Sequence, residues 1–343
     1  MRTRKLIPVL AFFLSIILVI IFMGYRLLFG TNLKTEGKKI TLLIPEGSTY
    51  LQALDTIKAH FKISNPDAFD WISKRKNYPR NVKPGSYVID KDLSYTGLID
   101  LLRSGRQTPV NITFNNARYL SDLAGKIGGK IEADSTEIME FLTNPDNYAK
   151  DGFTRENIIS VFIPNTYEFY WNTSAKELYT RMLREYRNFW NADRIARAEE
   201  MNLNPIEISI LASIVDEEAV QSDEKPRLAG VYLNRLRRGM PFQADPTIKF
   251  ALNDFSITRV LTKHLAIDSP YNTYKYKGLP PGPIGCPSIE GIDAVLNAEK
   301  HDYLYFAAKA DFSGFHNFSR TLSEHNRYAA EYHRELNRRR IYR

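Results

Sequence analysis

The chain has 343 residues, of which 43% are hydrophobic and 25% charged, so it is long enough for about two folded domains and is not wholly disordered. The formal net charge of +8 favours anionic partners, but the body of the chain has no dense stripe of Lys and Arg, so we do not expect nucleic acid as a partner. The single cysteine, Cys286, excludes an intrachain disulfide and a multi-cysteine metal site.

The N-terminus predicts a membrane anchor. Residues 6–25 read LIPVLAFFLSIILVIIFMGY without a charge, about the 20 residues that cross the hydrocarbon of a bilayer. A cleaved signal peptide would have an apolar core of only about 7–15 residues, followed by small residues at the cleavage site. Basic side chains precede the run, so the positive-inside tendency places residues 1–5 in the cytoplasm. We therefore expect a single-pass transmembrane helix over residues 6–28, with the rest of the chain outside the cytoplasm.

A small module follows the anchor. Residues 31–39 are polar, so we expect a short tether over residues 29–39, and residues 40–107 predict a strand, two helices and a second strand. Ser48 stands after a Pro-Glu-Gly turn and is the expected cap of the first helix. This order of elements is typical of a glycan-binding module of LysM type, although many other small α+β units share it.

The remainder, residues 108–343, mixes short strands with helices and predicts one mixed α+β domain. The fold class expected for the whole chain is therefore α+β, with an N-terminal transmembrane helix. A helix over residues 205–220 leads into a second helix that stops at Gly239. The loops that follow are rich in Pro, Gly and aromatic residues, and loops of this kind often carry binding sites.

The first of these helices ends in three consecutive acids, in the stretch LASIVDEEAV: Asp216, Glu217 and Glu218. A residue turns an α-helix by about 100°, so Glu218 points in nearly the same direction as the apolar Leu211 and Val215. The other two acids extend the solvated face. A carboxyl group against apolar walls has a raised pKa, and a carboxylic acid that keeps its proton near neutral pH can protonate a leaving oxygen.

Two structural alternatives remain open at this point. The helix can fray after Val215 and leave all three acids in water. Glu218 can also be an interior acid that pairs with Arg227 or Arg235.

Several loops supply side chains of the kinds that bind sugars, namely aromatic faces for the apolar side of a pyranose ring and amides or carboxylates for its hydroxyl groups. The candidates are Gln243, Asp245, Asn272, Tyr274, Tyr167, His316 and Asn317. Each has an ordinary structural explanation as well. Asn272 can close an Asx turn, Asp245 can cap the helix that begins at Pro246, and His316 can be a hydrogen-bonded turn residue.

Other chemistries fit poorly, and we expect neither a metal nor a cofactor. The six histidines form no H-x-x-x-H or H-E-x-x-H pair, and the chain has no G-x-S-x-G elbow and no phosphate-binding Gly-rich loop. Cys286 as a nucleophile, with His301 or His316 as its base, is less favoured than an incidental thiol.

The motifs LASIVDEEA, VYLNRL, QADPT, SPYNTY, GLPPGPI and FHNFSRTLSEHN occur in this order, after the segment IPNTYEFY. In this order they resemble the YceG-like family of bacterial endolytic murein transglycosylases. The resemblance implies an enzyme at the outer face of the inner (plasma) membrane that cuts nascent peptidoglycan strands internally and ends their elongation. It implies Glu218 as the catalytic acid, the second acid of the family's E-K-E triplet, with Asp216 in place of the first. It also implies peptidoglycan strands and the membrane as partners, with peptidoglycan synthases as further candidates.

The sequence departs from the family pattern at two points. Asn165 stands where an aspartate is usual in F-P-D-T-Y, which puts a charged role at this position in doubt. The residues Gly-Cys-Pro-Ser at 285–288 replace a more usual Ser-Asn-Pro-Gly, and this replacement can reshape a loop without touching the acid.

The resemblance implies a reaction in which one acid cleaves the bond between N-acetylmuramic acid and N-acetylglucosamine and leaves a 1,6-anhydro end. One alternative is a lysozyme-type hydrolase with Asp245 as the second carboxylate. A second alternative is a non-catalytic cell-wall-binding scaffold, in which the LysM-like unit carries the function.

Overall fold

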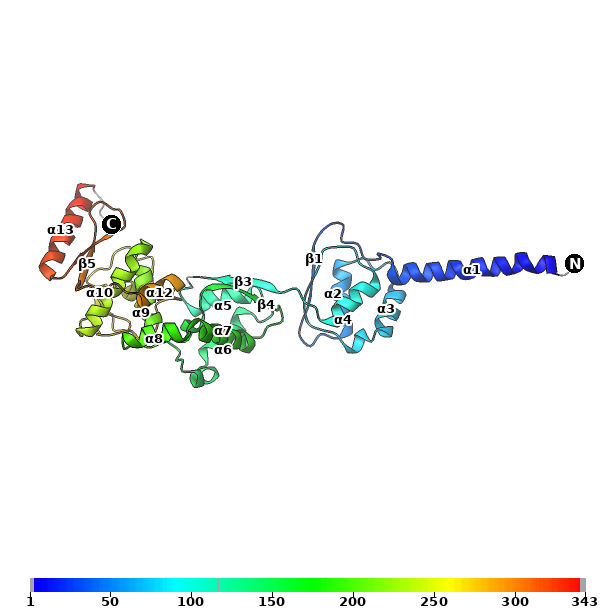
Figure 1. Cartoon of the computed structure of the whole chain (residues 1–343), viewed down its shortest axis with the longest axis horizontal. Helices are drawn as coiled ribbons and strands as arrows, with labels where there is room; N and C mark the ends of the chain where they lie inside the picture. Colours follow the sequence, from blue (N-terminus) through cyan, green and yellow to red (C-terminus); the bar gives the residue numbers. More distant parts are fainter. Residues whose placement is uncertain (1–2, 116, 340–343) are drawn as a thin grey trace. The chain divides into compact units, whose positions relative to one another are not determined.

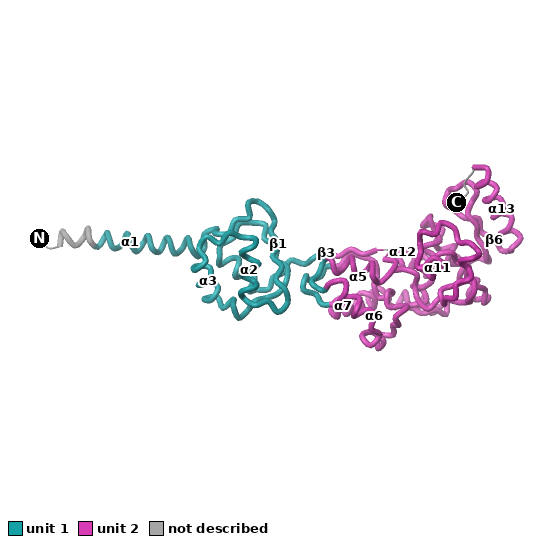
Figure 2. Tube along the Cα trace, turned by 180° about the vertical axis from the view of Figure 1, so that it is seen from behind, with its two compact units in different colours: residues 1–111, 130–133, 168–174 teal, residues 112–129, 134–167, 175–343 magenta. Residues whose placement is uncertain are grey.

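The computed structural model describes residues 3–115 and 117–339 and has the expected mixed α+β class, with three two-stranded sheets among these residues. The chain forms two compact units (Figure 2). Unit 1 comprises residues 1–111, 130–133 and 168–174. Unit 2 comprises residues 112–129, 134–167 and 175–343. The main boundary thus lies four residues beyond the expected one.

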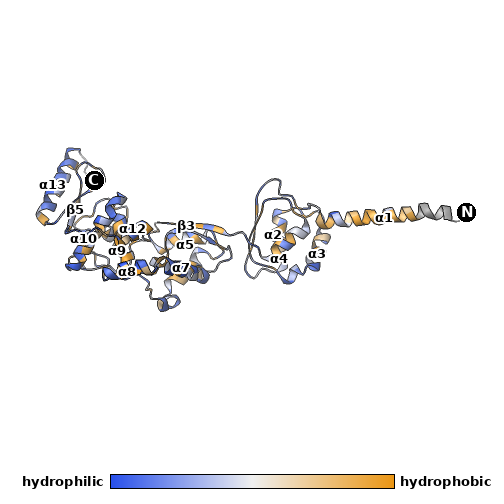
Figure 3. Cartoon of the chain, viewed as in Figure 1, coloured by the Kyte–Doolittle hydropathy of each residue, from blue (hydrophilic) through white to orange (hydrophobic). Residues whose placement is uncertain are grey.

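The chain begins with a long apolar helix, α1, over Thr3–Phe29 (Figures 1 and 3). Its segment Leu10–Phe29 is the one described helix that is long and apolar enough to cross a membrane, and it is not buried within the protein. The helix is consistent with the expected single-pass anchor.

Unit 1 has the predicted order of strand, two helices and strand. The elements are β1 (Ile40–Ile44), α2 (Tyr50–His60), α3 (Pro66–Arg75), the 3-10 turn η1 (Tyr78–Arg80), β2 (Gly85–Ile89) and α4 (Tyr95–Ser104). The two strands pair antiparallel, with Ile40 opposite Ile89. The helices cover this ribbon, and side chains such as Leu42, Phe69 and Leu98 form a fully buried core. A LysM-type identity for this unit remains a prediction.

The segment over residues 29–39 differs from the free polar tether that we expected. Leu33 is completely buried in the core of unit 1, and its backbone pairs with that of Leu93 in both directions. The amide and hydroxyl groups of Thr35 both donate to Asp92. One apolar residue in a polar stretch was too small a signal to predict this attachment.

The cap of α2 is Thr49 rather than the expected Ser48. The Thr49 hydroxyl accepts from the backbone of Gln52, whose side chain accepts from the Thr49 backbone, so the pair forms a capping box. Ser48 instead donates to the carbonyl of Pro45. The tight turn between them requires Gly47, which has φ +71°.

The helices of unit 2 are α5 (Leu120–Gly128), α6 (Ser135–Thr143), α7 (Ala175–Phe189), α8 (Ala192–Glu200), α9 (Pro205–Glu218), α10 (Lys225–Arg237), α11 (Asp245–Ala251), α12 (Ile289–Leu296) and α13 (Leu322–Arg338). Its 3-10 turns are η2 (Pro145–Asn147), η3 (Ala149–Asp151), η4 (Ile158–Val161), η5 (Ser222–Glu224) and η6 (His264–Ala266). The strands β3 (Val110–Phe114) and β4 (Asn165–Phe169) form one pair, and β5 (Tyr305–Ala308) and β6 (His316–Ser319) form an antiparallel pair.

Helix α9 is the buried centre of unit 2. Asn204 caps it in a capping box with Glu207, and Pro205 occupies its first turn. All residues from 208 to 215 are buried, as in a helix that neighbours surround on every side. Helices α8, α10, α11 and α12 pack against it. Because these neighbours hold it, the C-terminal end of α9 has a fixed place.

We predict that Leu33→Ala lowers the free energy of unfolding of unit 1 by about 2–5 kcal/mol, because it leaves a cavity in a closed core. Native-state hydrogen exchange of the unit 1 helices measures the change. Leu51→Ala is the matched control, since Leu51 is 68% exposed and its removal leaves no cavity. Equal effects of the two substitutions would contradict an anchored segment.

Candidate active site

Three carboxylates share the last turn of α9. The C-terminal end of a helix carries a partial negative charge that disfavours anions, and this turn contains no basic residue of its own. The helix nevertheless continues to Glu218 and has its C-cap at Ala219, so the frayed alternative is excluded. Each acid meets a different partner from another part of unit 2.

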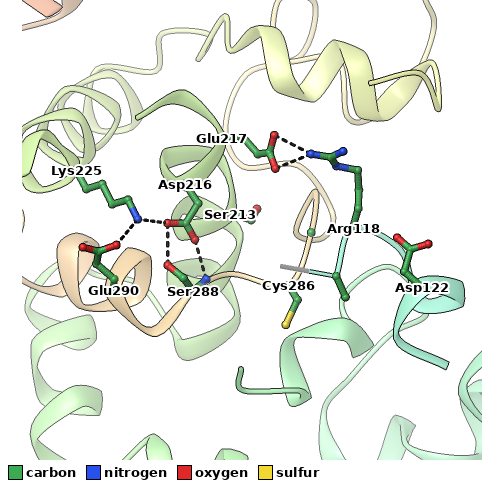
Figure 4. A pocket seen from close by; sticks show the side chains of 11 residues that line it. Arg118, Asp122, Ser213, Asp216, Glu217, Lys225, Cys286, Ser288 and Glu290 are labelled. Carbon is green, nitrogen blue, oxygen red and sulfur yellow. Dashed lines mark hydrogen bonds and ion pairs between the residues drawn. The ribbon is translucent and has the colours of Figure 1, made fainter. Parts of the chain in front are cut away.

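Asp216 is tied to two neighbouring helices and does not extend a solvated face as we expected. Its carboxylate accepts from the Ser288 backbone at 2.7 Å and from the Ser288 hydroxyl at 2.9 Å, and it pairs with the Lys225 ammonium at 2.9 Å (Figure 4). Lys225 also pairs with Glu290 at 2.7 Å. A side chain at Gly291 would collide with the Asp216 carboxylate, which explains the glycine. Asp216 therefore joins α9 to α10 and α12.

Glu217 lies on the more exposed side and pairs with Arg118, from the loop before α5, at 2.9 Å (Figure 4). The guanidinium of Arg118 also lies 3.5 Å from the centre of the Phe255 ring. Arg118 precedes Glu217 by 99 residues, so nothing local in the sequence indicates this pair.

Glu218 has no ion pair with any of the residues that the structure describes. The Tyr232 hydroxyl, from α10, donates to its carboxylate at 3.3 Å. Of the two arginines considered as partners, Arg227 pairs with Glu299 at 2.8 Å. Arg235 is 6% exposed and donates to backbone carbonyls, including that of Leu304 at 2.6 Å.

Burial raises the pKa of Glu218 from its usual 4.5 to about 7, and the negative charge of Asp245 adds to the rise. The hydrogen bond from Tyr232 and the charges of Lys249 and Arg235 oppose it. The residue as a whole is nevertheless partly exposed. Burial thus gives Glu218 the raised pKa that its alignment with Leu211 and Val215 predicts.

Asp245 is the first residue of α11 and does not cap it, since the cap position is Ala244 without a side-chain bond. The Tyr274 hydroxyl donates to the Asp245 carboxylate, and burial raises the pKa of Tyr274. The amino end of a helix favours a negative charge, so Asp245 is well placed as an anion. Glu218, Tyr232, Asp245 and Tyr274 form one cluster, which we name the acid cluster.

Asn272 and Gln243 shape the loops beside the acid cluster. Asn272 is fully buried, its amide donates to the carbonyls of residues 265 and 267, and its oxygen accepts from the Tyr274 backbone at 3.0 Å. It therefore closes the loop that presents Tyr274. Gln243 is exposed with φ +54°, and its backbone donates to Thr273 at 3.0 Å. Direct contact of either side chain with a substrate remains a prediction.

His316 reaches the acid cluster through an aromatic contact. Its ring nitrogen Nδ1 lies 2.8 Å from the buried Glu224 carboxylate, which also accepts from the His316 backbone. Its ring meets Phe306 edge-on at 5.3 Å, and Phe306 meets Tyr232 edge-on at 6.0 Å. Glu224 thus fixes the orientation of His316 on one side, and Phe306 packs against its ring.

Asn317 and Tyr167 lie in strands. Asn317 is partly exposed in β6, opposite Ala307. Tyr167 is 7% exposed in β4, donates its hydroxyl to the carbonyl of Ile163 at 2.7 Å and stacks on Phe114. Its observed contacts are those of a packing residue, and its predicted contact with a substrate is untested.

Cys286 is a structural thiol. It is 5% exposed, donates to the carbonyl of Phe162 at 2.9 Å, and burial raises its pKa to about 12. A thiol of this kind is protonated at neutral pH and is a poor nucleophile. Among residues 3–115 and 117–339, no group of three or more His, Cys, Asp and Glu could hold a metal ion.

Comparison with known proteins relates the chain to one family. The model of the YceG-like family matches residues 42–331. A protein of Bacillus subtilis (strain 168) named endolytic murein transglycosylase is 29% identical over 333 residues, which cover 90% of each chain. A protein of the same name from Streptococcus pneumoniae serotype 2 is 28% identical over 91% of this chain and 62% of its own length. The crystal structure of a YceG-like protein from Listeria monocytogenes aligns with a TM-score of 0.56 and 27% identity, over 84% of this chain and 98% of that one.

We predict that Glu218→Gln becomes more stable relative to wild type as the pH rises. Between about pH 4.5 and 7 the folded protein keeps a proton on Glu218 that the unfolded chain has released, so rising pH favours unfolding of the wild type alone. The difference in free energy of unfolding should grow by at most about 3.5 kcal/mol across this window, since one pKa unit corresponds to about 1.4 kcal/mol. Urea denaturation of both proteins at several pH values measures it, and a pH-independent difference would contradict the raised pKa.

Proposed function

The chain belongs to the YceG-like family, whose model covers most of it, and from this premise we propose that the protein is a membrane-anchored endolytic lytic transglycosylase of peptidoglycan. The observation that carries the proposal is the environment of Glu218, which keeps a proton near neutral pH and remains partly exposed. Relatives named endolytic murein transglycosylase support the substrate class.

In the first step Glu218 acts as the general acid. Its proton passes to the oxygen that links N-acetylmuramic acid to N-acetylglucosamine, and the bond from C1 of the muramic residue to this oxygen breaks. The bonding electron pair leaves with the oxygen, so positive charge develops on the muramic ring. The negative charge of Asp245 lies beside Glu218 and would stabilise this oxocarbenium-like state, and the Tyr232 hydroxyl, which donates to Glu218, would stabilise the carboxylate that forms.

In the second step the Glu218 carboxylate acts as the base. It takes the proton of the C6 hydroxyl of the same muramic residue, and O6 bonds to C1 to close a 1,6-anhydro ring. Glu218 regains its proton and no water is consumed, so the atoms balance. A residue that gives a proton and then takes one works best with a pKa near the working pH, and Glu218 has such a pKa.

The remaining candidate residues have proposed roles around this reaction. Gln243, Tyr274, His316 and Asn317 would contact the sugar rings, with Asp245 holding Tyr274 in place. For Asn272 we propose that it acts through the loop that it closes. Tyr167 stays a predicted contact of the bound strand, at a greater distance from the acid cluster.

The domain organisation is proposed from the sequence. Residues 1–5 would lie in the cytoplasm, residues 6–28 would cross the inner membrane, residues 40–107 would form a LysM-like glycan-binding module, and residues 108–343 would form the catalytic domain outside the cytoplasm. The segment 29–39 would act as a joint that is anchored to the module through Leu33. This arrangement places the catalytic domain where nascent strands emerge, and peptidoglycan synthases are the proposed partners there.

A second candidate function is hydrolysis of the same bond, because Asp245 supplies a second carboxylate beside Glu218. In that reaction Asp245 would act as nucleophile or activate a water. Asp245 already accepts a hydrogen bond from Tyr274, and this bond favours a supporting role over a nucleophilic one. A non-catalytic scaffold would not need a desolvated acid that is open to substrate.

We predict that Glu218→Gln keeps its fold and cuts peptidoglycan strands about 10²–10⁴-fold more slowly, the range for loss of a general acid. Release of soluble fragments from purified strands measures the rate. Glu217→Gln is the matched control, since it makes the same change one residue away on an acid that pairs with Arg118. Wild-type cleavage by Glu218→Gln would refute the assignment.

Mass spectrometry of the products separates the two candidate reactions. The transglycosylase account predicts fragments that are lighter by one water than hydrolysed fragments. Products with a free reducing end, lost equally in Glu218→Gln and Asp245→Asn, would instead favour hydrolysis.

We predict that kcat/KM falls above about pH 7, because Glu218 then loses the proton that it must donate. In Tyr232→Phe this fall should move to higher pH, since the Tyr232 hydroxyl lowers the pKa of Glu218. Rates on purified strands between pH 5 and 9 measure both effects. An unchanged profile in Tyr232→Phe would show that another group controls the fall.

A further inference from the structure

A cleft of about 480 Å³ lies in unit 2 and includes no member of the acid cluster among its lining residues. Three partly buried rings line one part of it. Tyr119 stacks on Phe250 with 5.7 Å between ring centres and 23° between planes, and Phe250 contacts Tyr271 at 4.7 Å. Apolar side chains and exposed polar ones, among them Arg155 and Asn253, form the rest of the lining.

This combination matches the chemistry of a sugar ring. One face of a pyranose presents C–H groups, which pack on aromatic faces, and its edge presents hydroxyl groups that need donors and acceptors. The cleft offers adjoining rings from three separate segments, with a guanidinium and an amide beside them. Pockets that bind small molecules are mostly apolar with a few polar groups of this kind.

The cleft and the acid cluster share two elements, namely helix α11 and the loop after η6. Helix α11 carries Asp245 at its first residue and Phe250 five residues later, about 7.5 Å along the axis at 1.5 Å per residue. The loop after η6 contacts both ends of this helix, with Tyr274 on Asp245 and Tyr271 on Phe250. Arg118 also lines the cleft and pairs with Glu217, the neighbour of Glu218, so the cleft adjoins the end of α9 that carries the acid.

We propose that this cleft is a saccharide subsite outside the acid cluster, which binds a sugar ring of the glycan strand away from the bond that is cut. The inference rests on the proposed function, since an enzyme that cuts within a strand binds several sugar rings on both sides of the cut. The subsite holds the strand so that the reacting ring is presented to Glu218, and its binding energy is available only to strands long enough to reach it.

The test measures binding separately from catalysis. In full-length Glu218→Gln protein, we compare the Kd for peptide-free glycan strands of at least six disaccharides with the Kd for a single disaccharide. The variant Phe250→Leu removes a ring and keeps an apolar side chain, and Arg155→Gln changes an exposed residue that the fold does not need. Each should weaken binding of long strands about five- to tenfold, the effect of roughly one lost ring or ionic contact, and leave disaccharide binding unchanged.

Tyr276→Leu is the matched control, because Tyr276 is an aromatic residue that is 43% exposed and does not line the cleft. Thermal unfolding verifies that each variant is folded. If Phe250→Leu does not fold, Arg155→Gln alone decides the test. Unchanged Kd values for long strands in both variants would overturn the proposal. An effect on peptide-bearing strands alone would also overturn it, because a peptide stem would then be the occupant.

The kinetic counterpart uses proteins with an intact Glu218. Phe250→Leu should lower kcat/KM on long strands and leave the rate on short ones unchanged, so the preference for long substrates disappears. If the wild type proves to be a hydrolase or a pure binder, the proposed function fails. The Kd comparison still shows whether the cleft binds a sugar ring.

Discussion

The end of helix α9 places three negative charges where the helix itself already has a partial negative charge. The surrounding structure offsets this unfavourable charge in a different way for each of the three acids. Lys225 and Ser288 neutralise and hold Asp216, and Arg118 neutralises Glu217. Glu218 has no cation partner within residues 3–115 and 117–339, and burial instead lets it keep its proton near neutral pH. Fixing the first two acids leaves the third as the proton donor that the proposed reaction requires.

The same contacts determine where the proton donor lies. Ser288 begins α12 and Lys225 begins α10, so Asp216 locks the last turn of α9 to both helices two residues before Glu218. Helix α10 then supplies Tyr232, and α11 supplies Asp245. A change in any of these helices would shift the acid against its neighbours. The pKa of Glu218 therefore depends on the packing of the whole C-terminal half of unit 2.

Periodicity was enough to single out Glu218, because an acid in line with buried apolar residues is a local signal. The strand and helix order of unit 1 was equally local. The partners of the other acids were not predictable, since Arg118 lies 99 residues from Glu217 and Ser288 lies 72 residues from Asp216, and each pair meets only through the fold. Tyr232 offered no signal beyond its place in a helical pattern. The cap at Thr49 was missed because two adjacent hydroxyl residues compete for one position.

The account depends on a carboxylic acid that keeps its proton near neutral pH. The most direct test is to follow the side-chain carboxyl signal of Glu218 by ¹³C NMR between pH 3 and 9, assigned by its absence in Glu218→Gln. The account predicts a midpoint at about pH 7. A midpoint at about 4.5, the usual value for glutamate, would contradict it and would leave the cluster without a proton donor at neutral pH.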